Sequence, residues 1–115
     1  MTRLDFTTRT LRTPRGTWTI VQQAPTPDGS VEVLLRRTPA DGGEPIYTAY
    51  RATPSGWRQL RGSWYRLEVA SEAAPHAAPD NHVCHPPLVA LLNLARPVPT
   101  TRPARRRRRA SAALI

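Results

Sequence analysis

Between residues 17 and 69, short runs of β-forming residues alternate with clusters of turn-forming residues. The run TWTIVQQ precedes APTPDGS, in which Pro27, Asp28 and Gly29 are typical of a tight turn. The next run, VEVLLRR, alternates between apolar and polar positions except at Leu34, and a glycine-rich stretch, TPADGGEP, follows it. This pattern predicts two β-strands joined by a turn, each with one face in a core.

Three further runs extend the pattern along the chain: IYTAYRA, WRQLR and SWYRLEV. TPSG separates the first two runs, and Gly62 separates the last two. Connections this short favour antiparallel neighbours, because parallel strands need long crossovers. We therefore expect a mainly β (α+β) fold, a small antiparallel meander of four to five strands over residues 15–70. Residues 1–14 alternate weakly and are expected to form an N-terminal arm or an edge strand.

The composition changes after residue 70. Residues 71–86 are rich in proline and histidine, which is typical of a linker. Residues 87–96 predict one short apolar helix, whose apolar face must pack against the sheet or another subunit and consists of Leu88, Leu91, Leu92 and Ala95. Residues 97–115 carry like charges and little apolar surface, so we expect a disordered basic tail.

A chain of 115 residues with 39% hydrophobic residues and 13 prolines is at most one small domain with tails. Its single cysteine, Cys84, excludes an intramolecular disulfide, so a core of this size is only marginally stable alone. A homodimer interface or a larger protein partner would add stability. The longest apolar stretch is too short to span a bilayer, and the first residues lack the apolar core of a signal peptide. These features favour a cytoplasmic protein without a membrane partner.

The formal net charge of +9 is concentrated at one end of the chain. Seven arginines and no acid lie from Arg96 onward, whereas the preceding residues hold ten arginines and eight acids. Guanidinium groups on a flexible segment neutralise phosphates and release counterions, which gives salt-sensitive, sequence-independent binding to DNA or RNA. The predicted contact residues of the tail are Arg102, Arg105, Arg106, Arg107, Arg108 and Arg109. The same run also suits an anionic membrane surface, an acidic protein, or a solvated tail with no specific role.

A second candidate surface lies on the predicted strand SWYRLEV and the strand before it. The residues of SWYRLEV expected to face the core are Ser63, Tyr65, Leu67 and Val69. An outward face bearing arginines and an aromatic ring can hold phosphates and stack bases, and its predicted members are Arg58, Arg66 and Trp64. The alternative is that the aromatic rings belong to the core or its rim, beneath arginine side chains. The scarcity of large apolar residues favours that alternative.

Metal binding and catalysis have weak support in this sequence. His76, His82, Cys84 and His85 can all ligate a transition metal, but three ligands within four residues do not close a tetrahedron. A polar linker is the simpler interpretation, although a metal shared between two subunits would escape the objection. No phosphate-binding glycine loop is present, and nothing orients a histidine beside Cys84 as a base. We expect neither an enzyme nor a cofactor.

The leading hypothesis is a small basic accessory protein that binds DNA or RNA non-specifically through its arginine-rich tail. All 17 basic residues are arginine, which favours a GC-rich bacterium or plasmid as the source and regulation of transcription or replication as the role. The sequence shows no helix-turn-helix to supply sequence specificity. The alternative is a protein–protein interaction module whose sheet and leucine-rich helix pack on a larger partner. A metal-sensing regulator is a third, weaker hypothesis.

Overall fold

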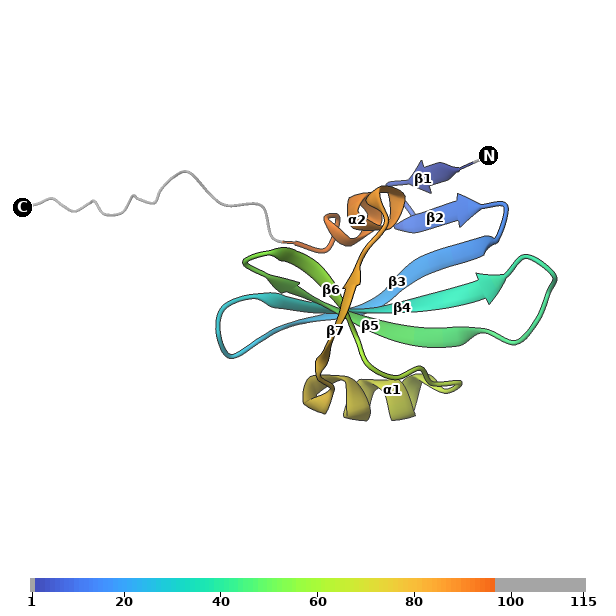
Figure 1. Ribbon diagram of the computed structural model, residues 1–115. Helices are drawn as coiled ribbons and strands as arrows, with labels where there is room; N and C mark the ends of the chain where they lie inside the picture. The colour runs from blue at the N-terminus through green and yellow to red at the C-terminus, as the bar shows by residue number, and fades with distance from the viewer. Residues whose placement is uncertain (1, 97–115) are drawn as a thin grey trace, which may run out of the picture.

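The computed structural model describes residues 2–96, and for residues 81–83 it describes the backbone alone. Within this part of the chain, seven strands form one antiparallel sheet in which every strand pairs with its neighbours in sequence (Figure 1). The strands are β1 (Arg3–Asp5), β2 (Thr10–Thr13), β3 (Gly16–Pro25), β4 (Val31–Pro39), β5 (Ile46–Thr53), β6 (Gly56–Leu60) and β7 (Pro79–Val83). The predicted antiparallel meander is therefore confirmed, with more strands than the expected four to five.

Two short helices lie on opposite faces of the sheet (Figure 1). They are α1 (Leu67–Ala73), continued by the 3-10 turn η1 (Ala74–His76), and α2 (Pro86–Leu92). Pro86 stands at the first position of α2, where a missing N–H leaves no hydrogen bond unmade. No helix among residues 2–96 is long and apolar enough to cross a membrane. The sheet is thus the middle layer between two single helices.

The face that carries α2 holds the larger hydrophobic cluster. Leu91 and Leu92 are fully buried there, and Ala95 and Leu88 pack beside them, as the apolar face of the predicted helix requires. The sheet supplies the other buried members: Leu11, Ile20, Val31, Val33, Leu35, Tyr50, Ala52 and Trp57. The helix therefore finds its partner within the same chain rather than in another subunit.

The face that carries α1 holds a smaller cluster, which explains the interruption of the alternating pattern at Leu34. Leu34 points away from the larger cluster and packs with Ala49, Leu60, Ala70 and Ala74. Ala70 and Ala74 are four residues apart and so share one side of the helical segment. The strand VEVLLRR is consequently buried on both faces at its centre, a pattern that a single covered face would not produce.

Two hairpins are closed by the same four-residue pattern, Thr-Pro-X-Gly. Thr13 pairs with Gly16, and Thr53 pairs with Gly56, so each loop contains two residues. In both turns the threonine Oγ1 donates a hydrogen bond to the glycine carbonyl oxygen, at 3.1 Å in the first and 2.6 Å in the second. Gly16 has a φ of 155°, and a Cβ there would lie 2.7 Å from the carbonyl oxygen of Thr38. The pattern therefore fixes the register between consecutive strands.

The prediction of a strand at SWYRLEV is wrong, because most of this run belongs to α1 and its approach. Trp64 makes an isolated bridge to Tyr47, and the chain then turns into helix at Leu67. Tyr65, Leu67 and Val69 are exposed rather than directed into the core. The small cluster needs alanines at helical spacing over Leu34 and Leu60, and this packing outweighs the preference of the run for β structure.

The predicted linker 71–86 contains regular structure. It begins within α1, continues through η1, and includes β7, which pairs with β6 at the sheet edge. The run PDNHV gains its strand conformation from this pairing, because it has no alternating pattern of its own. The predicted helix at 87–96 corresponds to α2, which begins at Pro86 and ends at Leu92. The expected disordered tail, 97–115, lies outside the described residues.

Candidate functional site

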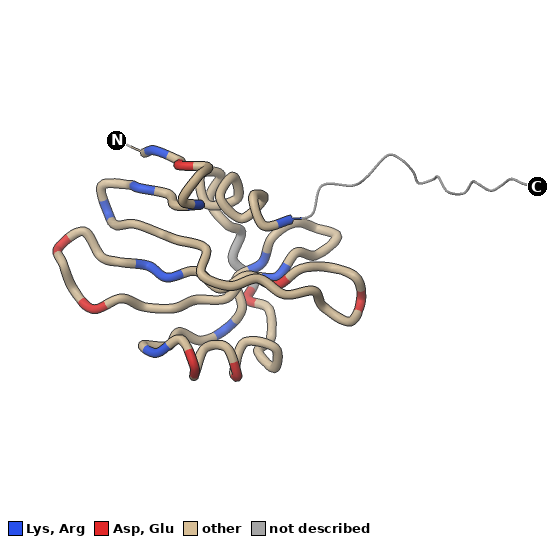
Figure 2. Tube along the Cα trace, turned by 180° about the vertical axis from the view of Figure 1, so that it is seen from behind, with Lys and Arg blue, Asp and Glu red and all other residues tan. Residues whose placement is uncertain are grey.

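The sheet face that carries α1 continues over β1 to β4 as a polar surface that we call the arginine–threonine face. Strand register defines its members, since residues directly opposite each other share a face. One row runs from Arg3 through Arg12 to Thr17 and Thr38, and the next row contains Thr19 and Arg36. All of them are exposed or half-buried. Figure 2 shows arginines recurring along the strands, and it shows acids in the hairpin turns and α1 as well as in the strands, where they are Asp5, Glu32 and Asp80.

Arg3 and Arg12 stand directly opposite each other on β1 and β2. Like charges in directly opposed positions destabilise a strand pair. None of the ion pairs found among residues 2–96 involves Arg3, Arg12 or Arg36. The fold therefore tolerates concentrated positive charge at this place without a carboxylate partner for each guanidinium.

Asp5 is the acid that shares this face most closely with the arginines. Its Oδ1 accepts hydrogen bonds from the backbone N–H groups of Thr7, at 2.9 Å, and Thr8, at 3.2 Å. The backbone hydrogen bond from Thr8 is the main cause that holds the pKa of Asp5 below its ordinary value, and Arg12 contributes least. Asp5 thus caps its own turn and forms no ion pair with Arg3 or Arg12 among the described residues.

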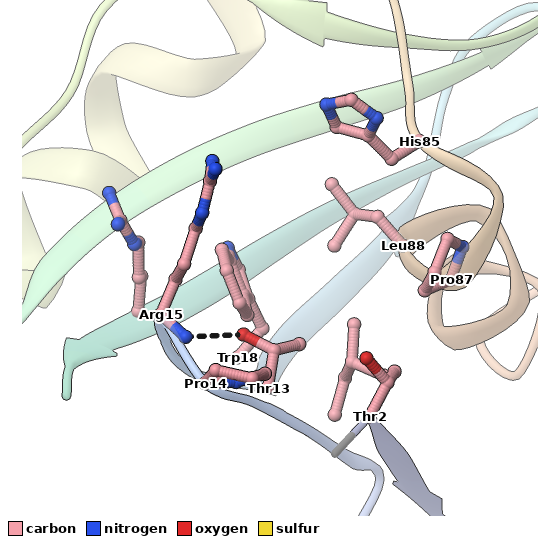
Figure 3. A pocket seen from close by; sticks show the side chains of 10 residues that line it. Thr2, Thr13, Pro14, Arg15, Trp18, His85, Pro87 and Leu88 are labelled. Atoms are coloured by element: carbon pink, nitrogen blue, oxygen red, sulfur yellow. Dashed lines mark hydrogen bonds between the residues drawn. The ribbon is translucent and has the colours of Figure 1, made fainter.

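A cavity of about 570 Å³ lies on the opposite face of the sheet, between the β2–β3 hairpin, β4 and the start of α2 (Figure 3). Its apolar wall consists of Leu11, Pro14, Trp18, Pro87 and Leu88, and its basic residues are Arg15, Arg37 and His85. The guanidinium carbon of Arg37 lies 5.3 Å from the centroid of the Trp18 ring, a cation–π contact. No acid lines this cavity.

Arg58, a predicted nucleic-acid-binding residue, lies on β6 beside α2. Its side chain is half-buried and donates a hydrogen bond to the Oγ of Ser55 at 3.3 Å. It lines a smaller cavity of about 370 Å³ together with Trp57 and Arg96. Arg96 lies 5.3 Å over the Trp57 ring, whose Nε1 donates to Asn93 Oδ1 at 2.8 Å. These contacts connect β6 to the segment that follows α2.

Trp64 and Arg66, the other two predicted residues of the sheet surface, lie on the approach to α1 rather than on a strand. Trp64 is half-buried against the smaller cluster, and Arg66 is exposed and forms an ion pair with Glu68 at 3.9 Å. The structure therefore does not bring Arg58 together with Trp64 and Arg66 on one outward strand face. The strand alternation that grouped them is absent, because α1 replaces the strand. The tail residues Arg102 and 105–109 lie outside the described part of the chain.

The candidate metal ligands do not gather where their side chains are described. His76 is exposed at the end of η1, and His85 is exposed just before α2 on the opposite face. Cys84 is half-buried, and its Sγ donates to the Trp57 carbonyl oxygen at 3.6 Å. Across residues 2–96, no group of three His, Cys, Asp or Glu side chains could hold a metal ion. The side chain of His82 is outside this description.

Burial controls the chemistry of the single thiol. Desolvation raises the pKa of Cys84 above its ordinary value, and the charge of Arg58 opposes this rise only in part. A thiol that stays protonated is a poor nucleophile and a poor metal ligand. The contacts of Cys84 are those of a packing residue.

Comparison with known proteins adds no functional assignment. No protein family model matches the chain, and neither curated proteins nor solved structures show a significant similarity to it. The candidate residues that sequence reasoning missed are Arg3, Arg12, Arg36 and the lining of the larger cavity. The sequence contained a signal for Arg36, because it lies two residues from Leu34 and therefore on the same face of the strand. Only the opposite face of that strand entered the prediction.

Proposed function

We propose that this protein binds the phosphate backbone of DNA or RNA without sequence specificity. The arginine-rich tail supplies most of the attraction, and the arginine–threonine face supplies a second, rigid contact. The observation that carries the proposal is the direct opposition of Arg3 and Arg12 without an ion-pair partner in the described chain. Regulation of transcription or replication in a bacterium or on a plasmid is the setting proposed for this activity.

The chemistry of the face suits phosphate. Arginine guanidinium groups and threonine hydroxyls are among the groups that contact phosphate oxygens in protein–nucleic acid complexes. Successive strands place their side chains about 5 Å apart across the sheet, so Arg3 and Arg12 can share one phosphate or hold two successive ones. A phosphate between them would also relieve the repulsion of the like charges.

The test is a salt titration of binding to labelled single-stranded and duplex oligonucleotides, read by fluorescence anisotropy. Deletion of residues 102–115 is expected to remove most of the affinity at low salt. The double variant Arg3→Gln/Arg12→Gln is expected to reduce the slope of log K against log salt, because each neutralised phosphate contributes about 0.7 to 0.9. The reduction is about 0.7 to 0.9 if the two arginines share one phosphate and about 1.4 to 1.8 if they hold two.

A matched control is Arg15→Gln/Arg61→Gln, which removes the same charge from exposed arginines outside the arginine–threonine face. We expect this control to change the slope by less than half as much. The proposal is overturned if the intact protein ignores polynucleotides at low ionic strength. It is equally overturned if the tail deletion and the Arg3/Arg12 variant both bind as the parent does.

A second candidate function, a protein–protein interaction module, is favoured by the outer side of α1 and its approach. Tyr65, Leu67 and Val69 are 64%, 37% and 48% exposed, an apolar group with no cover in the described chain. The leucines of α2 do not serve this function, since Leu91 and Leu92 are already buried against the sheet. A dimer in sedimentation that becomes a monomer in Val69→Glu, with nucleic-acid affinity insensitive to the arginine variants, would favour this function.

A further inference from the structure

We propose that the 570 Å³ cavity between the β2–β3 hairpin, β4 and α2 is a binding site for a small organic anion with a flat apolar body. Aromatic carboxylates and nucleoside monophosphates share this chemistry. The site is on the face opposite the arginine–threonine face, so it is independent of the proposed contact with nucleic acid.

The size and the wall of the cavity suit a small molecule. Cavities that hold such ligands generally measure between about 300 and 1,000 Å³ and are mostly apolar with a few polar groups. Leu11, Trp18 and Leu88 come from two strands and a helix. Pro14 and Pro87 add two rigid rings (Figure 3). Such a wall is preorganised, because prolines and packed side chains lose little freedom when a ligand binds.

Arg37 is the residue that indicates an anion. Its Nε is buried and donates no hydrogen bond within residues 2–96. The contact with the Trp18 ring holds the guanidinium in place without using its N–H donors. A carboxylate or phosphate beside it would provide charge-assisted hydrogen bonds that the protein itself does not supply.

The other polar side chains that line the cavity include no acid. Arg15, at the tip of the β2–β3 hairpin, adds a second guanidinium, and His85 adds an imidazole at the start of α2. Because no carboxylate lines the cavity, its positive potential is not cancelled locally. An anionic head group near Arg15 and Arg37 would place its ring against Trp18 and Leu88.

The experiment follows the three tryptophan indole N–H signals of the full chain in a two-dimensional NMR spectrum. The signal of Trp18 is the one that disappears in Trp18→Phe. The ligands are 2-naphthoate, its neutral counterpart 2-naphthalenemethanol, and adenosine monophosphate. We expect the anions to shift the Trp18 signal and to leave the Trp57 signal, whose N–H is bonded to Asn93, nearly unchanged.

The anions should bind at least about tenfold more tightly than the neutral alcohol, because charge-assisted hydrogen bonds are roughly twice as strong as neutral ones. Arg37→Gln should abolish most of this preference, and Arg15→Gln should weaken it while leaving the packing under Trp18 intact. Arg61→Gln, which removes an equal charge from an exposed arginine outside both the cavity and the arginine–threonine face, is the matched control and should bind as the parent does. Tighter binding of naphthoate identifies the ligand class as a carboxylate, and tighter binding of the monophosphate identifies it as a nucleotide.

Three results would overturn the proposal. They are equal affinity for the naphthoate and the alcohol, an unchanged anion affinity in both Arg37→Gln and Arg15→Gln, and equal shifts of the Trp18 and Trp57 signals. Loss of nucleic-acid binding in the salt titration would leave this site unaffected, so the two proposals fail separately.

Discussion

Removal of the Leu91 side chain tests whether α2 closes the larger hydrophobic cluster. Leu91 is 0% exposed and packs between the helix and the sheet. Leu91→Ala deletes three buried carbon groups, which at about 0.8 kcal/mol each amounts to about 2.4 kcal/mol of lost transfer free energy. The cavity that remains adds to this loss, so measured values for such substitutions are about 2.7 to 5 kcal/mol.

Urea unfolding followed by tryptophan fluorescence measures the effect. Domains of this size lose about 1 to 3 kcal/mol of stability per molar urea, so a loss of about 3 kcal/mol lowers the midpoint by about 1 to 3 M. The expected total free energy of unfolding is about 5 to 15 kcal/mol, which leaves the variant measurable at 25 °C or below.

Leu67→Ala is the matched control, since it makes the same chemical change in the other helix. Leu67 is 37% exposed on α1 and outside the cluster members, so we expect a loss below about 1 kcal/mol. Equal losses for Leu91→Ala and Leu67→Ala would refute the arrangement of the two helices. A larger loss of unfolding free energy for Leu67→Ala than for Leu91→Ala would favour the strand that the sequence pattern predicted at Leu67.

Three further predictions concern a turn, an ion pair and the thiol. Gly16→Ala places a Cβ 2.7 Å from the Thr38 carbonyl oxygen and should cost about 1 to 3 kcal/mol in thermal unfolding, whereas Gly42→Ala, with a φ of 82° and open space, should cost about 1 kcal/mol. Glu32→Gln removes the carboxylate charge that accepts two hydrogen bonds from Arg51, at 2.8 and 3.1 Å. The free energy of unfolding in urea should fall by about 1 to 2 kcal/mol at low salt and by less at high salt. No difference from the parent at either salt concentration would contradict the role of this ion pair. At pH 8, Cys84 should react with iodoacetamide more slowly in the folded chain than in the chain unfolded by urea, because burial raises the pKa of the thiol. The contribution of Cys84 to stability should be complete below the ordinary thiol pKa and be lost as the pH rises through the raised pKa. Equal reaction rates in the folded and unfolded chain would show that the thiol is not buried.

The antiparallel sheet was predictable because its turns carry explicit chemistry. Pro-Asp-Gly and the Thr-Pro-X-Gly stretches fix tight connections, and alternation in VEVLLRR identifies the core face. The helix α1 was not predictable from its own residues, since Val69 and the aromatic rings before it favour strand. Its conformation depends on the fit of Ala70 and Ala74 over Leu34, which is a contact between distant parts of the chain.

The candidate sites show the same division between local and distant information. The arginine content was plain in the sequence, but the opposition of Arg3 and Arg12 depends on the register of β1 against β2. The cavity around Arg37 depends on α2 meeting the β2–β3 hairpin, which no local pattern encodes. Grouping Arg58 with Trp64 and Arg66 failed because it required one continuous alternation across a segment that changes from strand to helix.

Because α2 follows all seven strands in the described chain, it is synthesised after the sheet that it covers. The seven strands leave the ribosome before Leu91 and Leu92 do, so the nascent sheet presents its larger apolar face to solvent until the helix emerges. During that interval the face is a substrate for chaperones and for aggregation with neighbouring chains. Folding therefore completes late, and a product truncated before Pro86 would keep its larger apolar face uncovered.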